Sequence, residues 1–195
     1  MKHPIYIAGM STMVDRTRRG FRLDEGMAML ARTPAAVDAL LRDLPDGWTT
    51  VNEGGESWSP FDVVGHLVRA ERVDWMGRVR TLLTHGEAEA FASVDRLAQF
   101  RESEGRTLAT LLDEFASLRR ESLRELAALA LTEADLDRAG RHPVFGSVTL
   151  RQLLSTWVAH DLDHLVQIAR VLARQYSDEV GPWRVNLRII NGTPI

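Results

Sequence analysis

Three histidines in this chain combine the residue type and the spacing needed to bind a metal ion. His160 and His164 stand four residues apart in a segment with strong helical periodicity. Residues at this separation share one face of a helix, so both imidazoles point the same way. His66 takes an inward position in a second predicted helix. Histidines from two helices can hold a divalent ion and leave coordination positions open for chemistry.

The ligand set does not select the metal, because zinc, nickel, cobalt, iron(II) and copper all accept imidazole nitrogen. Each histidine must present an unprotonated nitrogen, so we expect metal affinity to fall as the pH drops through the histidine range. The competing interpretation is a set of hydrogen-bonded core histidines. The metal is favoured because burying adjacent imidazoles without a metal or an acidic partner is costly. The zinc-protease motif is incomplete, since Asp161 stands where that motif has glutamate.

Further residues of the same helix lie close to the histidines in sequence. Asp161 and Asp163 could support an imidazole as outer hydrogen-bond partners, or could be solvated. Gln167 lies one turn beyond His164 and could hydrogen-bond a coordinated water or substrate, or be a polar residue of the core. Trp157, on the same inward seam, is predicted to belong to a pocket wall or to the core.

Two helices are expected in the first half of the chain. The first covers about 24–44, with a bend or restart at Thr33-Pro34. The second begins at Ser59, an N-cap residue followed by proline, and runs to about residue 83. Its predicted inward seam consists of Val63, His66, Ala70, Val73 and Gly77.

Two more helices are expected in the second half. The third covers about 103–129 and carries Arg119 among charged residues that suggest a solvated face. The fourth begins at a capping box formed by Thr149 and Gln152 and ends near Arg174.

Four helices with long connections, at 84–102 and 130–148, predict an all-α four-helix bundle. Such connections mean that the helices need not alternate in direction along the chain. No segment predicts a major sheet. A short strand is conceivable at 185–190 or at 5–8.

The composition limits the possible classes. The chain of 195 residues is long enough for one domain, and 45% hydrophobic with 26% charged residues excludes a disordered protein. A net charge of −3 without a basic block argues against a nucleic-acid partner. The absence of cysteine excludes disulfides and protein thiolate ligands. With no signal-peptide pattern and no long apolar run, we expect a cytoplasmic protein without membrane contact.

Segments 58–67 and 157–168, together with the long third helix, resemble the DinB/YfiT-like metal-dependent hydrolase superfamily. The specific feature is their order, with one histidine early in the second helix and His-x-x-x-His in the fourth. The ending at 176–183 is also similar to endings in that family. The resemblance covers about 24–183. It leaves 1–23 as an N-terminal extension and predicts one domain over 24–195.

The resemblance implies an antiparallel-type bundle, often in a homodimer, with zinc or nickel held by His66, His160 and His164. Characterised relatives include thiol S-transferases that use bacillithiol or mycothiol, and a mycothiol-dependent maleylpyruvate isomerase. We therefore expect an enzyme that transfers a low-molecular-weight thiol to an electrophilic small molecule. The alternatives are a metal-dependent hydrolase of small substrates and a non-enzymatic, stress-related metal-binding module.

Overall fold

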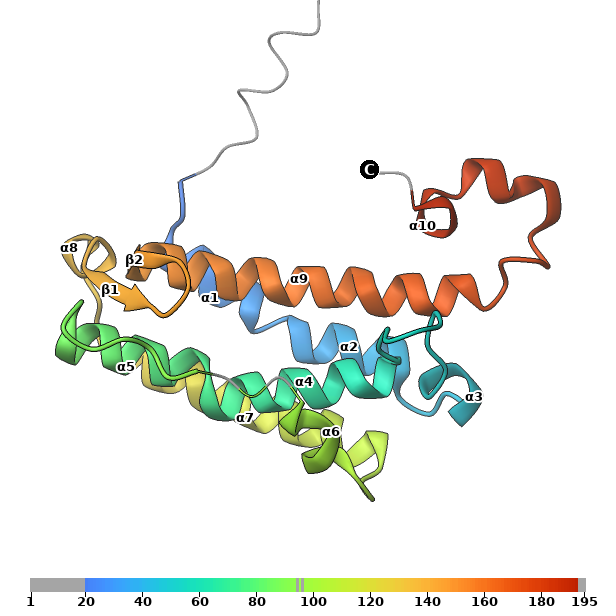
Figure 1. Ribbon diagram of the computed structural model, residues 1–195, viewed down its shortest axis with the longest axis horizontal. Helices are drawn as coiled ribbons and strands as arrows, with labels where there is room; N and C mark the ends of the chain where they lie inside the picture. The colour runs from blue at the N-terminus through green and yellow to red at the C-terminus, as the bar shows by residue number, and fades with distance from the viewer. Residues whose placement is uncertain (1–19, 94, 96, 193–195) are drawn as a thin grey trace, which may run out of the picture.

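The computed structural model describes residues 20–93, 95 and 97–192. Its long helices lie side by side as a four-helix bundle, and shorter helices and a two-stranded hairpin occupy the connections (Figure 1). None of the described helices is both long and apolar enough to cross a bilayer. The all-α class and the four-helix bundle expected from the sequence are confirmed.

The first helix of the bundle consists of two pieces, α1 (Leu23–Leu30) and α2 (Thr33–Leu41). Pro34 stands in the first turn of α2, where its missing amide hydrogen is not needed. Proline therefore starts a new helix here, as the sequence predicts. A one-turn helix, α3 (Asp46–Thr49), leads to the second helix of the bundle.

The second helix is also divided, into α4 (Pro60–Val73) and α5 (Trp75–His85). The division at Asp74 changes which side chains are buried. Val73, which the sequence placed in the inward seam, is 48% exposed. That prediction was wrong because one helical period was extended across a residue whose backbone departs from α-helical geometry (φ −104°, ψ −69°). The buried face of α5 is formed by Trp75, Met76, Val79 and Leu82.

Capping boxes fix the starts of the two helices that carry the histidines. At α4, the Ser59 hydroxyl accepts from the Asp62 amide at 3.2 Å, and Asp62 accepts from the Ser59 amide at 2.9 Å. The fourth helix, α9 (Leu150–Arg174), begins with the same reciprocal pair made by Thr149 and Gln152. These bonds satisfy amide groups that otherwise have no partner inside the helix.

The third helix is shorter than predicted, because α6 (Ala98–Ser103) is separate from α7 (Leu108–Ala128). Arg119 on α7 is 1% exposed, so the prediction of a solvated position was wrong. It follows Phe115 by one turn and lies on the same buried side of the helix. Charged side chains are almost never fully buried unless they are paired, and Arg119 has two carboxylate partners.

The connection before α9 contains a short helix and a hairpin. The helix α8 (Glu133–Leu136) precedes β1 (Ala139–His142), which pairs antiparallel with β2 (Gly146–Thr149). The sequence did not predict these strands, because neither has an extended run of β-branched or aromatic residues. Their pairing depends on the turn between them.

The segment after α9 is helical. It forms the 3-10 helix η2 (Gly181–Asn186) and the short helix α10 (Arg188–Asn191). The strand considered at 185–190 was therefore wrong, since Pro182 in the first turn of η2 favours a helical start. The other candidate strand, at 5–8, lies outside the described residues.

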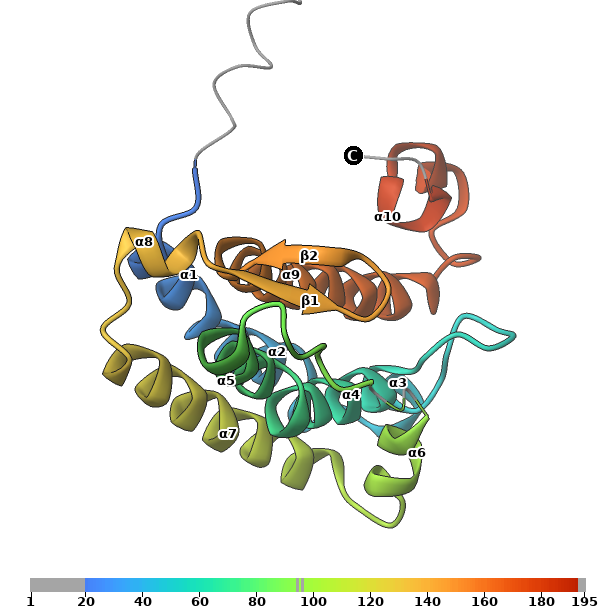
Figure 2. The same ribbon diagram turned by 60° about the vertical axis from the view of Figure 1, so that its left-hand side comes forward.

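The helices do not alternate in direction. Val63 of α4 and Leu111 of α7 pack in one hydrophobic cluster, while Leu82 of α5 and Leu126 of α7 pack in another. The second and third helices therefore run in the same direction, opposite to the first and fourth (Figures 1 and 2). The antiparallel arrangement implied by the resemblance holds only in part. The connection between the second and third helices must therefore run back along the bundle. An extended chain of about 12 residues is long enough for this, because it spans up to about 40 Å.

These two clusters occupy opposite halves of the bundle. One half contains Leu30, Trp75, Val79, Leu82, Leu126, Leu150 and Trp157, among others. The other contains Val37, Val63, Leu67, Leu111, Phe115 and Ile168, among others. On α9, Trp157 belongs to the first cluster and Ile168 to the second. His160, Asp161 and His164 lie between them, so a polar layer crosses the middle of the bundle.

Replacing the N-cap residue of α9 should measurably weaken the fold. We expect Thr149→Ala to lower the free energy of unfolding by about 1 kcal/mol, because one amide of the first turn loses its acceptor. Chemical denaturation of the two proteins measures this difference. Thr156→Ala on the same helix is the matched control, since its hydroxyl bonds only to the Gln152 carbonyl of its own helix. An equal loss in both variants would contradict the capping role.

Candidate metal centre

The three predicted histidines meet at their Nε2 atoms. Nε2 of His160 lies 3.0 Å from Nε2 of His66 and 3.1 Å from Nε2 of His164. His66 comes from α4 and the other two from α9, which pack against each other. Two imidazole nitrogens that share one zinc ion at about 2.0–2.1 Å in a tetrahedral site lie about 3.3 Å apart, close to these separations. Within the described part of the chain, these three residues form the group whose ligand atoms are close enough to share an ion.

Two glutamines orient two of the rings. The Gln99 side-chain oxygen lies 2.8 Å from Nδ1 of His66, and the Gln167 oxygen lies 2.8 Å from Nδ1 of His164. An amide oxygen only accepts, so each Nδ1 carries the hydrogen and each Nε2 keeps its lone pair. Hydrogen bonds of this kind fix the tautomer of metal-binding histidines.

His160 completes the set without such a partner. Its Nδ1 atom is buried and makes no hydrogen bond to any described residue. Its Nε2 atom faces two nitrogens whose lone pairs point toward it, and lone pairs at this separation repel unless a cation or a proton lies between them. The donor set therefore fits a divalent ion bound by three neutral imidazoles.

Burial keeps His160 and His164 unprotonated. Burial and the charge that protonated His164 and His66 would carry lower the pKa of His160 from 6.5 to about 2. Burial also lowers the pKa of His164, against the opposing effect of its hydrogen bond to Gln167. A metal ligand needs the free nitrogen lone pair, so the environment prepares the required protonation state.

Two tryptophans flank the histidines. Trp58, just before α4, has its ring 5.0 Å from that of His66 and stacks on His164 at 6.1 Å. Trp75, at the start of α5, meets His160 edge to face at 5.1 Å. These rings reduce the access of water to the nitrogens and restrict rotation of the imidazoles.

The sequence also placed four further residues of α9 near the histidines, and the structure gives each of them a different environment. Gln167 contacts His164, as described above. Asp161 directs both carboxylate oxygens to Arg119, at 2.6 and 3.1 Å. Asp163 is exposed on the outer side of α9. Trp157 is fully buried, and its ring stacks on Trp75 at 5.5 Å.

Sequence reasoning missed Gln99, which lies in a connection and shows no periodic pattern. A local signal for its position exists at Gly65. A Cβ atom there would collide with the Ser103 hydroxyl, so glycine lets α6 approach α4 closely. This approach brings Gln99 to His66.

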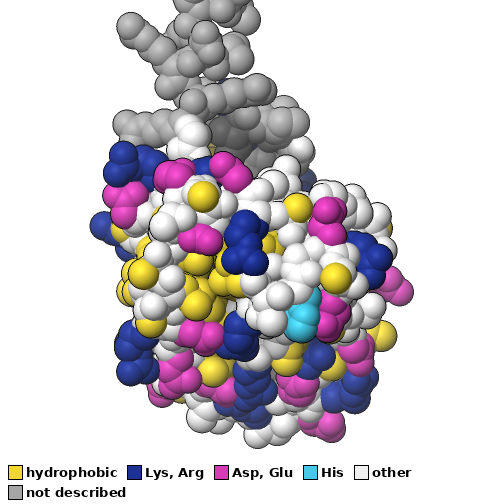
Figure 3. Space-filling view, turned by 90° about the vertical axis from the view of Figure 1, so that its left-hand side faces the viewer, with side chains coloured by type: hydrophobic (Ala, Val, Ile, Leu, Met, Phe, Trp, Pro, Cys, Tyr) yellow, Lys and Arg dark blue, Asp and Glu magenta, His cyan; other side chains and the backbone are white. Residues whose placement is uncertain are grey.

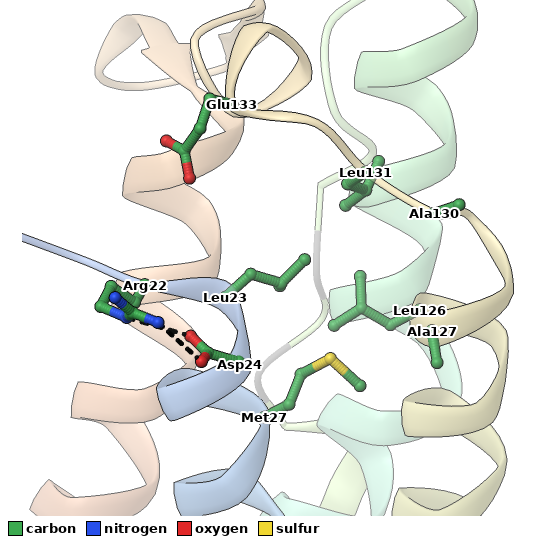
Figure 4. A pocket seen from close by; sticks show the side chains of 9 residues that line it. All are labelled: Arg22, Leu23, Asp24, Met27, Leu126, Ala127, Ala130, Leu131 and Glu133. Carbon is green, nitrogen blue, oxygen red and sulfur yellow. Dashed lines mark hydrogen bonds and ion pairs between the residues drawn. The ribbon is translucent and has the colours of Figure 1, made fainter.

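A separate hollow lies at the end of the bundle near α8. This cavity of about 460 Å³ is lined by Met27, Leu126 and Leu131, with the exposed ion pair of Arg22 and Asp24 at its edge (Figure 4). The surface at that end mixes acidic and basic side chains around hydrophobic ones (Figure 3). The lining of this cavity includes none of the three histidines, so the cavity is distinct from the candidate metal centre.

Comparison with known families decides the classification of the chain. The model of the DinB superfamily matches residues 29–168, which include all three histidines. The chain belongs to the DinB superfamily. No curated protein matches it.

The solved structure of YfiT agrees with the four-helix fold. YfiT from Bacillus subtilis, described as a probable metal-dependent hydrolase with an unusual four-helix bundle topology, superposes with a TM-score of 0.69 at 21% identity. The match covers 84% of this chain and 92% of YfiT. A four-helix bundle protein, TT2238, gives a TM-score of 0.45 at 22% identity over 73% of this chain and 94% of its own.

The stability of the metal-free protein should depend on pH through His160. Its pKa is about 2 in the folded state and 6.5 when unperturbed, so the unfolded chain binds the proton first as the pH falls. The stability is therefore present above pH 6.5 and is lost below it. Between pH 7 and pH 5 we expect the free energy of unfolding to fall by about 2 kcal/mol from this group.

Denaturant titrations of chelator-treated protein at both pH values measure this loss. His160→Gln should remove most of it, whereas His85→Gln, which changes an exposed histidine, should retain it. Equal pH dependence in the parent and in His160→Gln would contradict the assignment.

Gln99 should contribute to metal affinity without binding metal itself. Gln99→Leu keeps a similar side-chain size but cannot accept the Nδ1 hydrogen of His66. We expect zinc affinity to fall about 10-fold to 100-fold, as for other outer hydrogen-bond partners of metal ligands. Competition with a chromogenic chelator measures the affinity. Gln175, just after the end of α9, is half-buried and donates to the Trp48 carbonyl rather than to a histidine. Gln175→Leu therefore serves as the control, and a similar loss in both variants would argue against the role of Gln99.

Proposed function

We propose that this DinB protein is a metal-dependent enzyme whose divalent ion, zinc or nickel, is held by His66, His160 and His164. One observation carries the proposal, the convergence of three Nε2 atoms from two helices with separations of 3.0 and 3.1 Å. The hydrogen bonds that His66 and His164 donate to the two glutamines support it, as does the low pKa of His160, because both leave the Nε2 lone pairs available.

The protein supplies no negative charge among the three ligands. A divalent ion bound by them would lower the pKa of a coordinated thiol or water and so provide a nucleophile near neutral pH. Trp58 and Trp75 would shield that position from bulk water, and the half-buried Trp58 would offer aromatic surface to an apolar substrate.

We propose thiol S-transfer as the reaction. The chain contains no cysteine, so the thiol must come from a small molecule, such as bacillithiol or mycothiol. The second substrate would be an electrophilic small molecule that the thiol sulfur attacks. Neutral imidazole ligands favour this chemistry, because the ion keeps its full charge to attract a thiolate.

Hydrolysis of a small substrate is the second candidate. It uses the same three histidines and needs no added thiol. The description of YfiT as a probable metal-dependent hydrolase supports it, although at 21% identity the likeness concerns the fold. The two reactions differ in one requirement that an assay can separate, the dependence on thiol.

The metal content of the protein should depend on His164. We expect untagged, chelator-free protein to contain close to one divalent ion per chain by mass spectrometry of metals, and His164→Ala to lose it. His85→Ala, at an exposed histidine, is the matched control and should retain the ion. Little metal in the parent, even after reloading with zinc, nickel and manganese, would leave the histidines with a structural role.

The metal-loaded protein then tests the reaction itself. Product formation from an electrophile that requires bacillithiol or mycothiol would support S-transfer. Ester or amide cleavage that persists without thiol would favour hydrolysis. Turnover in neither assay would favour a metal-binding module without catalytic activity.

A further inference from the structure

A buried arginine lies next to the metal centre and is not part of it. The Arg119 guanidinium uses all five of its N–H groups. Nε and Nη2 donate to Glu71 Oε1 at 2.9 and 2.7 Å, Nη1 and Nη2 donate to Asp161 at 2.6 and 3.1 Å, and Nη1 donates to the Leu30 carbonyl at 2.8 Å. The side chains of the three charged residues are 0–2% exposed.

These bonds join all four helices of the bundle at one level. Arg119 belongs to α7, Glu71 to α4, Asp161 to α9, and Leu30 to the end of α1. One rigid, planar group thus sets the distances among four elements that are separate in sequence. A lysine could not do this, because its single ammonium lacks the fork of donors.

The two carboxylates are attached to the helices that carry the histidines. Asp161 directly follows His160 on α9. Glu71 follows His66 by five residues on α4, a rise of about 7.5 Å along the helix. The gap that Arg119 spans between α4 and α9 is therefore the same gap across which the two Nε2 atoms meet at 3.0 Å.

A second set of contacts connects Arg119 with the ring of His160. Its guanidinium lies 5.3 Å from the ring of Trp157, whose Nε1 donates to Glu71 Oε1 at 3.2 Å. Trp157 stacks on Trp75, and Trp75 meets the edge of His160. Arg119 thus constrains His160 through its neighbour in sequence and through two stacked indoles.

Stability alone is a weak reason for such a group. Removing charges from water is costly, and buried ion pairs are often replaceable by hydrophobic residues without loss of stability. A metal site, in contrast, requires its ligands to be held within about 0.5 Å of the binding geometry. Arg119 meets that requirement, because it fixes the spacing of the two ligand-bearing helices.

We propose that Arg119 is a positioning residue that presets the metal centre by holding Glu71 of α4 and Asp161 of α9 at a fixed separation. The inference rests on the proposed metal site but not on which reaction occurs there. It assigns to α7, a helix that contributes no ligand, control over metal affinity and coordination geometry.

The test compares metal binding with folding in the full chain. Arg119→Lys retains the charge but cannot bridge both carboxylates, and Arg120→Lys, at the exposed neighbour, is the matched control. We expect Arg119→Lys to bind zinc at least 10-fold more weakly in a chelator competition, with Arg120→Lys within about twofold of the parent. The visible absorption of bound cobalt(II) should change in Arg119→Lys only, because it reports the coordination geometry.

A second variant separates positioning from folding. In Glu71→Gln/Arg119→Met/Asp161→Leu, the buried charges are removed together, and Gln at position 71 can still accept from Trp157. We expect this protein to melt close to the parent in the metal-free state and still to bind zinc at least 10-fold more weakly.

Two results would overturn the inference. One is parental zinc affinity and cobalt spectrum in either Arg119 variant. The other is a loss of zinc affinity that occurs only where the melting temperature of the metal-free protein also falls. Failure of both variants to fold counts as this second result. A parent that binds neither zinc nor cobalt would refute the metal site itself, a result distinct from both because it appears before any substitution.

Discussion

The buried guanidinium of Arg119 is the constraint on which the middle of this bundle depends. Its five donors are all used, and their acceptors come from three other helices. In an apolar interior, an unsatisfied charge is far more costly than in water, so these partners cannot separate without a large penalty. The helices that carry the histidines are therefore held at one spacing, whatever the mobility of the loops.

The polar layer divides the core into two apolar halves, and each half packs a different set of helices together. The cluster around Trp157 holds α5, the end of α7 and the start of α9, while the cluster around Phe115 holds α2, α4 and the start of α7. Neither cluster includes one of the three histidines among its members. The layer between them can therefore be specialised for chemistry, because the fold is stabilised on both sides of it.

The site combines parts of different origin. The histidines come from two long helices, whereas Gln99 comes from a short helix in the connection between α5 and α7. That connection exists because the second and third helices run in the same direction and the chain must return along the bundle. Because the second and third helices are parallel, the connection between them places Gln99 as a hydrogen-bond partner next to His66, a predicted metal ligand.

The sequence by itself determined the helical class, the capped starts of α4 and α9, and the shared face of His160 and His164, because all of these follow from spacing along one helix. It could not determine the burial of Arg119, the exposure of Val73, or the contact of Gln99 with His66. Each of these depends on residues distant in the chain: two carboxylates on other helices, a break at Asp74, and a glycine that admits a neighbouring helix. Local periodicity records which side of a helix is apolar, and only the tertiary structure decides which charges meet across the core.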